Sequence, residues 1–355
     1  MIAPRRCSVR AARGSDVRVL YIGATWRGSN SQSFRSAFES LGHEVVAIET
    51  EEPLAFYGRS LALRAVHRIL KRPLRRHTRP LREAALDAAR ATRPHLVFAT
   101  KALHFDGNFI EDIRRASGAM LVHWHPDDYK HRGSSSADFA NAISVYDVQV
   151  TPKTFNVAEF LEDGARRVEF IPYSYDPDVH RPVPPRTGPT RDAVFVGSFE
   201  PERAGYLEHA AREGIDLEVW GGYWHRLPKR SPLRPHCLYR EVRADDMAAA
   251  FASAKLSLGF LRKANRDLHT ARTFEIPASG GVMLAERTDE QRAFFEEGKE
   301  ALYFDSSEEM VARIREYAGR PDELAKIRAA ALDRCRRGRY SYAERLQDLL
   351  SRILR

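Results

Sequence analysis

The stretch that decides the fold is VRVLYIGATWRGSNSQSFRSAFESLGHEVVAIE, residues 17–49. It begins with an apolar, β-rich run at 17–22 that ends at Gly23. A polar loop and a helical pattern of aromatic and small apolar residues follow, closed by Gly42, and a second β-rich run occupies 44–49. A strand, a glycine-containing loop, a helix and a second strand form the opening βαβ unit of a Rossmann-like sheet.

The same order of elements repeats along the chain. In the first half, strands are predicted at 95–100, 119–124, 148–151 and 168–171, and helices at 109–116 and 156–163. A second unit begins with a strand at 193–196. Its further predicted strands are 217–220, 255–260, 282–285 and 301–304. Helices are predicted at 245–254, 271–278 and 342–354, and another begins at residue 321. A further helix opens with a capping box at 306–309 and runs to residue 317. We therefore expect two alternating α/β halves.

A proline-rich segment separates the two halves. Five prolines and Gly188 lie between residues 176 and 191, and proline interrupts both helices and sheets. The predicted divisions are a disordered extension (1–16), an N-terminal domain (17–180), a linker (181–191), a C-terminal domain (192–340) and a last helix that crosses back to the first domain (341–355). The expected fold class is α/β, with two Rossmann-like domains that face a central cleft, where a ligand binds.

Composition narrows the class of protein. The 355 residues are 43% hydrophobic, which is typical of a packed chain. No run reaches the ~18 apolar residues of a membrane span, and residues 1–16 lack the apolar core of a secretory signal. Cys7, Cys237 and Cys335 are widely spaced and odd in number, so neither a disulfide framework nor a cysteine zinc site is indicated. We expect a cytoplasmic protein.

The net charge is +9, and the densest run of basic residues is KRPLRRHTR at 71–79. Such a run binds nucleic acid, binds an anionic membrane surface, or is a solvated helical face. No zinc finger, helix-turn-helix or aromatic RNA-binding signature accompanies it, so nucleic acid is not expected as a partner. Peripheral contact with the inner face of a membrane and a solvated face both remain open.

Residues 267–281, DLHTARTFEIPASGG, carry the strongest chemical signal. A helix that begins near Thr270 presents Arg272 and Glu275 three residues apart on one face. Backbone N–H groups at a helix start attract phosphate, and an arginine adds a charge-assisted contact. Glu275, one turn further, is placed to accept hydrogen bonds from a ribose diol. The alternative is a surface ion pair on an ordinary helix.

Residues 272–281, with Glu286 and the run 300–304, resemble the C-terminal half of spore-maturation CgeB-like glycosyltransferases, a bacterial type within the GT-B class. The resemblance implies that Glu275 holds the ribose of a nucleotide-sugar donor. Asp267 lies eight positions earlier, where many relatives have the first glutamate of an E-x7-E pattern, and it would meet the sugar. The aspartate is one methylene shorter than that glutamate.

A second match, at residues 196–203, resembles the strand and loop that contact the donor diphosphate in the same class. It implies that Arg203 binds the diphosphate together with Arg272, beside Gly197 and Ser198, where the absence of a bulky side chain at the glycine lets the backbone approach the ligand. Tyr239, ahead of a predicted helix, is a candidate to clasp the base.

The resemblance also implies that arginines, and no bound metal, stabilise the departing diphosphate. Asp176 and Asp178 are the only close candidate for an Asp-x-Asp metal motif, and they lie beside the hinge prolines. No cofactor is expected, and the donor substrate would be a UDP-, GDP- or dTDP-sugar.

Residues 123–129, HWHPDDY, end a predicted strand and are expected to face the cleft. His125, Asp127 and Asp128 are the candidates to bind or deprotonate an acceptor hydroxyl. The alternative is ordinary loop chemistry, with an aspartate capping the next segment.

The expected function is a metal-independent glycosyltransferase of hexosyltransferase type, with a protein, polysaccharide, lipid or small molecule as acceptor. Two alternatives share the fold: a sugar-nucleotide epimerase, and a catalytically decayed protein used for binding or surface assembly.

Overall fold

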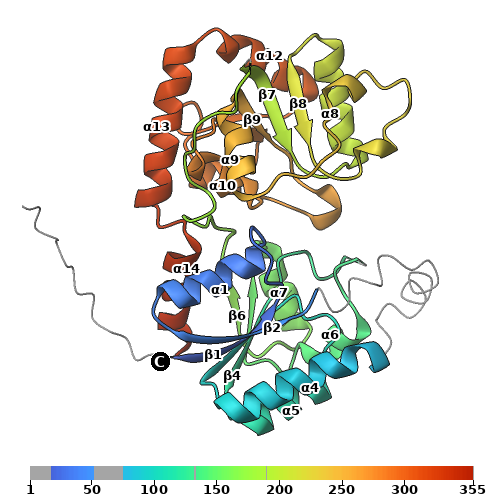
Figure 1. Ribbon diagram of the computed structural model, residues 1–355, viewed down its shortest axis with the longest axis vertical. Coiled ribbons are helices and arrows are strands. Elements are labelled where there is room, and N and C mark those ends of the chain that lie inside the picture. Colours follow the sequence, from blue (N-terminus) through green and yellow to red (C-terminus); the bar gives the residue numbers. More distant parts are fainter. Residues whose placement is uncertain (1–16, 52–74, 132, 189, 355) are drawn as a thin grey trace, which may run out of the picture.

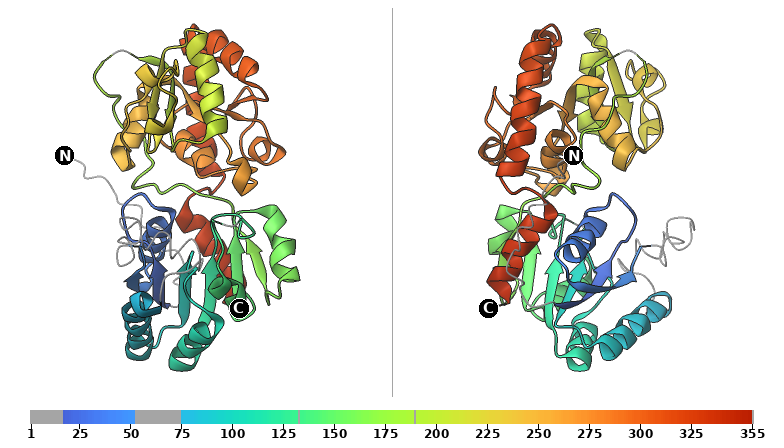
Figure 2. Two further views of the ribbon diagram at one scale, coloured as in Figure 1. Left: turned by 90° about the vertical axis from the view of Figure 1, so that its right-hand side faces the viewer. Right: turned by 60° about the vertical axis from the view of Figure 1, so that its left-hand side comes forward.

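The computed structural model describes residues 17–51, 75–131, 133–188 and 190–354 and contains two parallel sheets covered by helices (Figures 1 and 2). The predicted extension at 1–16, with Cys7, and residues 71–74 of the basic run lie outside the described residues. Among the described helices, none is long and apolar enough to cross a membrane. The predicted α/β class is confirmed.

The N-terminal sheet has the strand order β2-β1-β3-β4-β5-β6, and all of its pairings are parallel. Its strands are β1 (Arg18–Gly23), β2 (Glu44–Glu49), β3 (Leu96–Thr100), β4 (Met120–Trp124), β5 (Val148–Thr151) and β6 (Val168–Phe170). Its helices are α1 (Asn30–Ser40), α4 (Arg75–Thr92), α5 (Gly107–Ser117), α6 (Ala137–Ala142) and α7 (Thr154–Glu162).

The C-terminal sheet has the order β11-β10-β9-β7-β8 and is also parallel. Its strands are β7 (Arg191–Val196), β8 (Leu217–Trp220), β9 (Ala254–Gly259), β10 (Met283–Glu286) and β11 (Leu302–Phe304). The helices that follow or cover them are α8 (Pro201–Arg212), α9 (Ala244–Ala252), α10 (Arg272–Ala278), α11 (Asp289–Phe294), α12 (Ser307–Ala318), α13 (Pro321–Arg337) and α14 (Tyr342–Ile353). Short 3-10 turns occupy Trp224–Arg226, Arg234–His236 and Lys263–Asn265.

In each sheet the chain adds strands first on one side of the starting strand and then on the other, so the strand order has one switch point. In the first sheet the switch point falls between β1 and β3, and in the second between β7 and β9. Loops at the carboxyl ends of such strand pairs diverge to opposite faces and leave a crevice between them, which is where open α/β sheets bind ligands. The two crevices face each other across the gap between the domains.

The first sheet is packed on both faces because alternate residues of a strand point in opposite directions. Leu20 and Ile22 of β1 join the core under α4 and α5. Val19 and Tyr21 join a core shared with α1 and α14. Gly23 ends β1 because any side chain there would collide with the hydroxyls of Ser31 and Thr100. This packing role accounts for the first glycine of the loop.

The last helix, α14, lies on the N-terminal domain beside α1, whereas α13 lies on the C-terminal domain (Figure 1). The ring of Tyr342 meets that of Phe34 edge-on, with centroids 4.8 Å apart. Where the chain returns to the first domain, Tyr175 donates its N–H to the Tyr340 carbonyl (3.1 Å) and accepts the Tyr342 N–H (3.0 Å). The two segments that connect the domains are therefore hydrogen-bonded to each other.

A capping box has two hydrogen bonds, and the structure has only one of the two predicted at the start of α12. The Ser306 hydroxyl accepts the Glu309 N–H at 3.1 Å, as expected. The Glu309 carboxylate, however, accepts the Asp305 N–H and binds Arg287. Arg287 is 22 residues away in sequence, so no local pattern announces this competition. A complete capping box occurs at the start of α14, between Ser341 and Glu344.

We expect Leu349→Ala in α14 to lower the free energy of unfolding by about 2–5 kcal/mol, because a fully buried leucine would leave a cavity between α14 and the first domain. Leu354→Ala, at a residue 41% exposed, is the control and should cost less than about 0.5 kcal/mol. Urea denaturation measures both. Equal effects would show that α14 does not pack on the first domain in solution.

Candidate functional site

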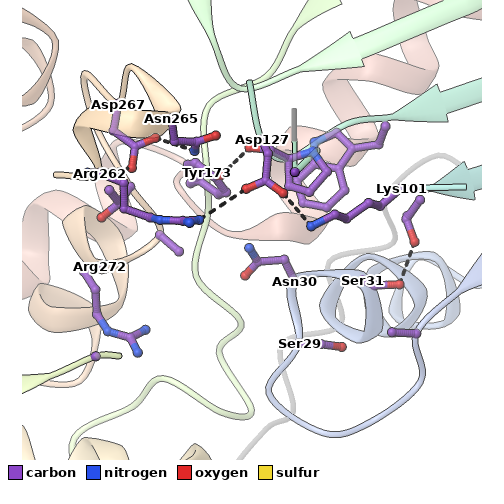
Figure 3. A pocket seen from close by; sticks show the side chains of 18 of the residues that line it. Ser29, Asn30, Ser31, Lys101, Asp127, Tyr173, Arg262, Asn265, Asp267 and Arg272 are labelled. Carbon is purple, nitrogen blue, oxygen red and sulfur yellow. Dashed lines mark hydrogen bonds and ion pairs between the residues drawn. The ribbon is translucent and has the colours of Figure 1, made fainter. Parts of the chain in front are cut away.

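A cavity of about 1310 Å³ lies between the domains, at the carboxyl ends of both sheets. Figure 3 shows part of its wall. The first domain contributes residues that follow β1 to β4, and the second contributes residues that follow β7 and β9 and begin α10. The charged members are Glu51, Lys101, Asp127, Arg203, Arg262, Asp267, Arg272 and Glu275. Of the eleven residues that the sequence singled out, Asp127, Asp267, Gly197, Arg203, Thr270, Arg272 and Glu275 line this cavity.

Arg272 and Glu275 form an ion pair at the start of α10, inside the cavity wall. The Nε of Arg272 also donates to the carbonyl of Val196, at the end of β7, over 3.1 Å. Glu275 is buried, whereas the Arg272 side chain is 29% exposed. The pair is therefore built into the wall and is not the exposed surface pair of the alternative interpretation. The Thr270 N–H is capped by the Thr273 hydroxyl at 3.1 Å.

His180 stands behind Glu275 and was not anticipated from the sequence. Its Nδ1 accepts the Asp176 N–H at 2.9 Å, so the neutral ring carries its proton on Nε2, which lies 3.5 Å from the Glu275 carboxylate. Burial lowers the pKa of His180, although the negative charge of Glu275 acts to raise it. A neutral histidine thus faces the buried carboxylate. A lone histidine beside prolines gives no sequence signal for such a role.

Arg203, on the first turn of α8, is a cation with little carboxylate compensation. Its nearest carboxylate oxygen, on Glu200, is 3.8 Å away, and one terminal nitrogen donates to the Ser198 carbonyl at 3.4 Å. The buried Nε has no hydrogen-bond partner among the described residues. Burial lowers the pKa of the Arg203 guanidinium. These are the properties of a cation held ready for an anionic ligand.

Gly197 also lines the cavity, and the backbone there is tightly packed. Gly221, at the end of β8, has φ +135° and abuts the Gly197 carbonyl, so a side chain at Gly221 would collide with it. The same carbonyl accepts the Trp224 indole N–H at 2.9 Å. The Ser198 side chain is exposed and does not line the cavity.

Tyr239 does not line the cavity. Its backbone is left-handed (φ 55°), its side chain is 44% exposed, and its hydroxyl donates to the Arg234 carbonyl at 3.3 Å. The sequence placed it correctly ahead of α9 but did not reveal the turn that carries its ring outward. The predicted contact with a base therefore has no support in this geometry.

Asp267 is held on three sides. One carboxylate oxygen accepts hydrogen bonds from the Lys153 ammonium and from the Asn265 amide, the latter at 2.7 Å. The other oxygen accepts the Arg262 N–H at 3.1 Å. Lys153 belongs to the first domain, so this ion pair crosses between the domains. Neither Lys153 nor Asn265 was predicted, because nothing local in the sequence links them to Asp267.

The three candidates of the 123–129 segment have different surroundings. Asp127 lines the cavity, 2.6 Å from the Lys101 ammonium and 3.7 Å from the Arg262 guanidinium (Figure 3). Burial acts to raise the pKa of the Asp127 carboxyl, but Lys101, His125 and Arg262 outweigh it and leave that pKa below its usual 3.8. Asp127 therefore stays ionised between two cations, one from each domain.

His125 and Asp128 lie behind the wall. Both ring nitrogens of the fully buried His125 contact backbone carbonyls, of Asp127 at 2.9 Å and of Ser134 at 2.8 Å, and burial lowers its pKa to about 4. Asp128 binds Arg266 of the second domain through two hydrogen bonds, of 2.6 and 2.8 Å. Neither lines the cavity. Both therefore shape the site without facing it.

Arg266 ties the domains together from outside the cavity. Besides Asp128, it binds both carboxylate oxygens of Glu159, each at 2.8 Å. Asn265 accepts the Asp128 N–H at 2.7 Å, and the Thr154 hydroxyl reaches Glu290 over 2.5 Å.

Among the described residues no group of three His, Cys, Asp or Glu side chains is arranged to hold a metal ion.

Comparison with solved structures identifies the architecture as the GT-B fold. HepE of Anabaena, solved with UDP and glucose, matches 95% of this chain and 100% of its own at a TM-score of 0.62 and 12% identity. Sucrose-phosphate synthase of Thermosynechococcus elongatus matches 95% of this chain and 99% of its own, at a TM-score of 0.63 and 12% identity. A putative UDP-N-acetylglucosamine 2-epimerase of Listeria monocytogenes matches 96% of this chain and 96% of its own, at a TM-score of 0.56 and 15% identity. These likenesses confirm the predicted GT-B fold.

At the level of sequence, residues 203–351 match a family model described as glycosyl transferase-like. The matched segment contains Arg203, Asp267, Arg272 and Glu275, and it ends within α14. Comparison with curated protein sequences gave no match. The family match and the GT-B neighbours together support a relationship to GT-B glycosyltransferases, and the CgeB-like subtype stays a prediction.

We expect Arg266→Ala to lower the free energy of unfolding at neutral pH by about 1–3 kcal/mol, because it leaves the buried Asp128 carboxylate without its cation. Burial acts to raise the pKa of Asp128, but hydrogen bonds from Arg266 and Asn156 outweigh it and leave that pKa below 3.8. Stability from a lowered carboxyl pKa is present above the ordinary pKa and is lost as the pH falls through the folded one. The difference from wild type should therefore shrink below about pH 4.

The control is Arg292→Ala, which removes an exposed arginine 3.8 Å from Asp289 and 3.6 Å from Glu297. It should change the free energy of unfolding by less than about 0.5 kcal/mol. Urea denaturation at a series of pH values measures both variants. A destabilisation by Arg266→Ala that is unchanged at pH 3 would contradict the assignment to Asp128.

Proposed function

We propose that the protein is a nucleotide-sugar-dependent glycosyltransferase. The observation that carries the proposal is the placement of Arg203, Arg272 and Glu275 on one wall of the interdomain cavity, within the segment that matches the glycosyl transferase-like family. Support for a nucleotide-sugar donor comes from HepE, which has the same fold and was solved with UDP-glucose. In this proposal the C-terminal domain binds the donor and the N-terminal domain binds the acceptor.

On the donor wall, Arg203 and Arg272 bind the diphosphate and the buried Glu275 accepts hydrogen bonds from the ribose. The N–H groups at the start of α10 add to the positive potential at that point. As the bond between the sugar and the diphosphate breaks, negative charge builds up on the departing oxygen. Cations fixed in advance at that position stabilise this charge without a metal ion, and we propose that the reaction is metal-independent.

On the acceptor side we propose Asp127 as the residue that meets the attacking hydroxyl. It is the one member of the trio His125, Asp127 and Asp128 that lines the cavity. The hydroxyl oxygen forms a bond to the anomeric carbon, the nucleoside diphosphate leaves with the bonding electrons, and the hydroxyl proton passes to the Asp127 carboxylate. We further propose a hexose as the sugar and retain the CgeB-like subtype.

A sugar-nucleotide epimerase is the second candidate, because the epimerase from Listeria monocytogenes shares the fold over 96% of both chains. An epimerase releases an altered sugar nucleotide without any acceptor, whereas a transferase releases the nucleoside diphosphate. A decayed binding protein would bind the donor without turnover. Product analysis by chromatography separates all three.

We expect one of UDP-, GDP- and dTDP-sugars to stabilise the wild-type protein by about 2.7 kcal/mol when present at 100 times its Kd, as measured in a thermal-shift panel. Glu275→Ala and Arg272→Ala should each abolish binding of that donor in isothermal titration calorimetry. Each removes a proposed ligand contact and leaves its buried or half-buried partner unpaired.

The matched controls are Arg313→Ala and Glu316→Ala, which break a pair with the same i,i+3 spacing on α12, away from the cavity. They should bind the donor with wild-type affinity. Undiminished donor affinity in Glu275→Ala would refute the proposed site, and failure of the wild-type protein to bind any nucleotide sugar would refute the proposed function.

A further inference from the structure

Lys153 is a fully buried lysine that lies between β5 and α7 of the N-terminal domain. Its side chain is 1% exposed, and its ammonium pairs with Asp267 of the C-terminal domain, whose side chain is 3% exposed. The ammonium also lies 5.2 Å from the centre of the Tyr173 ring. Lysine is rarely buried unless it is paired, so this position needs its carboxylate partner.

Asp267 lines the cavity, whereas Lys153 does not. Lys153 can therefore act on a ligand only through Asp267. An ionised carboxylate has about four lone-pair positions. Three of those on Asp267 are taken, by Lys153, by the Asn265 amide and by the Arg262 N–H. One acceptor position is left for a group in the cavity, and the three bonds fix its direction.

The place of Asp267 in the cavity indicates which group it would meet. Figure 3 shows the Arg262 side chain between Asp267 and Arg272 on the C-terminal side of the cavity, with Asp127 across from it on the N-terminal wall. Under the proposed function, the diphosphate binds at Arg272 and the acceptor hydroxyl at Asp127. The group between them is the sugar that is transferred.

We infer that Lys153 is a positioning residue for the donor sugar, an inference that rests on the proposed function. With Asn265 and Arg262, it holds the Asp267 carboxylate in one orientation, aimed at a sugar hydroxyl. Because Lys153 comes from the acceptor domain, the sugar subsite of the donor domain is complete only when the two domains are arranged as they are here. The nucleotide part of the donor does not depend on this contact.

A merely structural tie between the domains would not require a lysine at this point. Arg266 already joins Asp128 and Glu159 across the same interface, and neither Arg266 nor those carboxylates line the cavity. The Thr154–Glu290 hydrogen bond adds another tie next to Lys153. Two of the described cross-domain ion pairs reach a cavity-lining carboxylate, Lys153–Asp267 and Arg262–Asp127, and only in the first is the cation fully buried and outside the cavity wall.

The test compares Lys153→Met with wild type in calorimetric titrations with two probes, the nucleotide sugar that binds wild type and the matching nucleoside diphosphate. We expect the variant to bind the nucleotide sugar about 10-fold more weakly or worse, because an ionised hydrogen-bond partner is lost. Binding of the nucleoside diphosphate should change by less than about threefold, a small fraction of one such contact.

Two further variants guard against misfolding. Lys153→Met combined with Asp267→Asn removes both charges, so it should recover thermal stability without recovering the preference for the nucleotide sugar. Lys130→Met breaks a Lys–Asp pair of 2.6 Å on the surface, with Asp163, and should behave as wild type.

Equal losses for both probes in Lys153→Met, or no loss for either, would overturn the role of Lys153 and leave the proposed function standing. A double variant that regains the preference for the nucleotide sugar would overturn it as well. A wild-type protein that binds no nucleotide sugar would overturn the proposed function, and the role of Lys153 with it.

Discussion

The two domains are joined by buried charges that neither domain neutralises alone. Lys153 faces Asp267, and Asp128 faces Arg266, in each case across the interface. Lys153 and Asp267 are both buried, and removing one partner of such a pair typically costs about 3–5 kcal/mol, because the remaining charge stays out of water without compensation. Arg266 is 43% exposed, so its pair with Asp128 contributes less. These cross-domain pairs help to hold the two domains in the arrangement that forms the cavity.

The same electrostatics decides which cations are available to a ligand. Lys101 and Arg262 share Asp127, and Arg272 is paired with Glu275. Arg203 is the exception, because its nearest carboxylate oxygen is 3.8 Å away and its Nε has no partner among the described residues. Arg203 is therefore the cavity arginine with the least carboxylate compensation. Arg272 would have to share its charge between the ligand and Glu275.

The sequence predicted the strands and most of the helices because their signals are local, whereas α6, α8 and α11 were not predicted. A strand, a glycine and an amphipathic helix lie within about thirty residues of one another, as in the 17–49 unit, so one window contains the whole pattern. The i,i+3 spacing of Arg272 and Glu275 is equally local, and both residues line the cavity as one built pair. Predictions of this kind depend only on neighbours in the chain.

The cross-domain contacts could not be predicted in the same way. Lys153 and Asp267 are 114 positions apart, and Asp128 and Arg266 are 138 apart. No propensity or period connects them, so Asp128 was interpreted as a ligand-facing residue when it is an anchor behind the wall. Tyr239 was misplaced for a different reason. A left-handed turn at that residue (φ 55°) points its ring away from the cavity, and such a turn is rare for tyrosine.

The aspartate at position 267 and the lysine at position 153 are best understood as parts of one feature. The family resemblance places a glutamate where this chain has Asp267, and the shorter side chain withdraws the carboxylate toward its own backbone by one methylene. The Asp267 side chain is 3% exposed and that of Lys153 is 1% exposed. Lysine has the reach to bring a positive charge to this carboxylate from the opposite domain. A buried carboxylate needs such a partner, so the pair links the sugar-facing side of one domain to the arrangement of both.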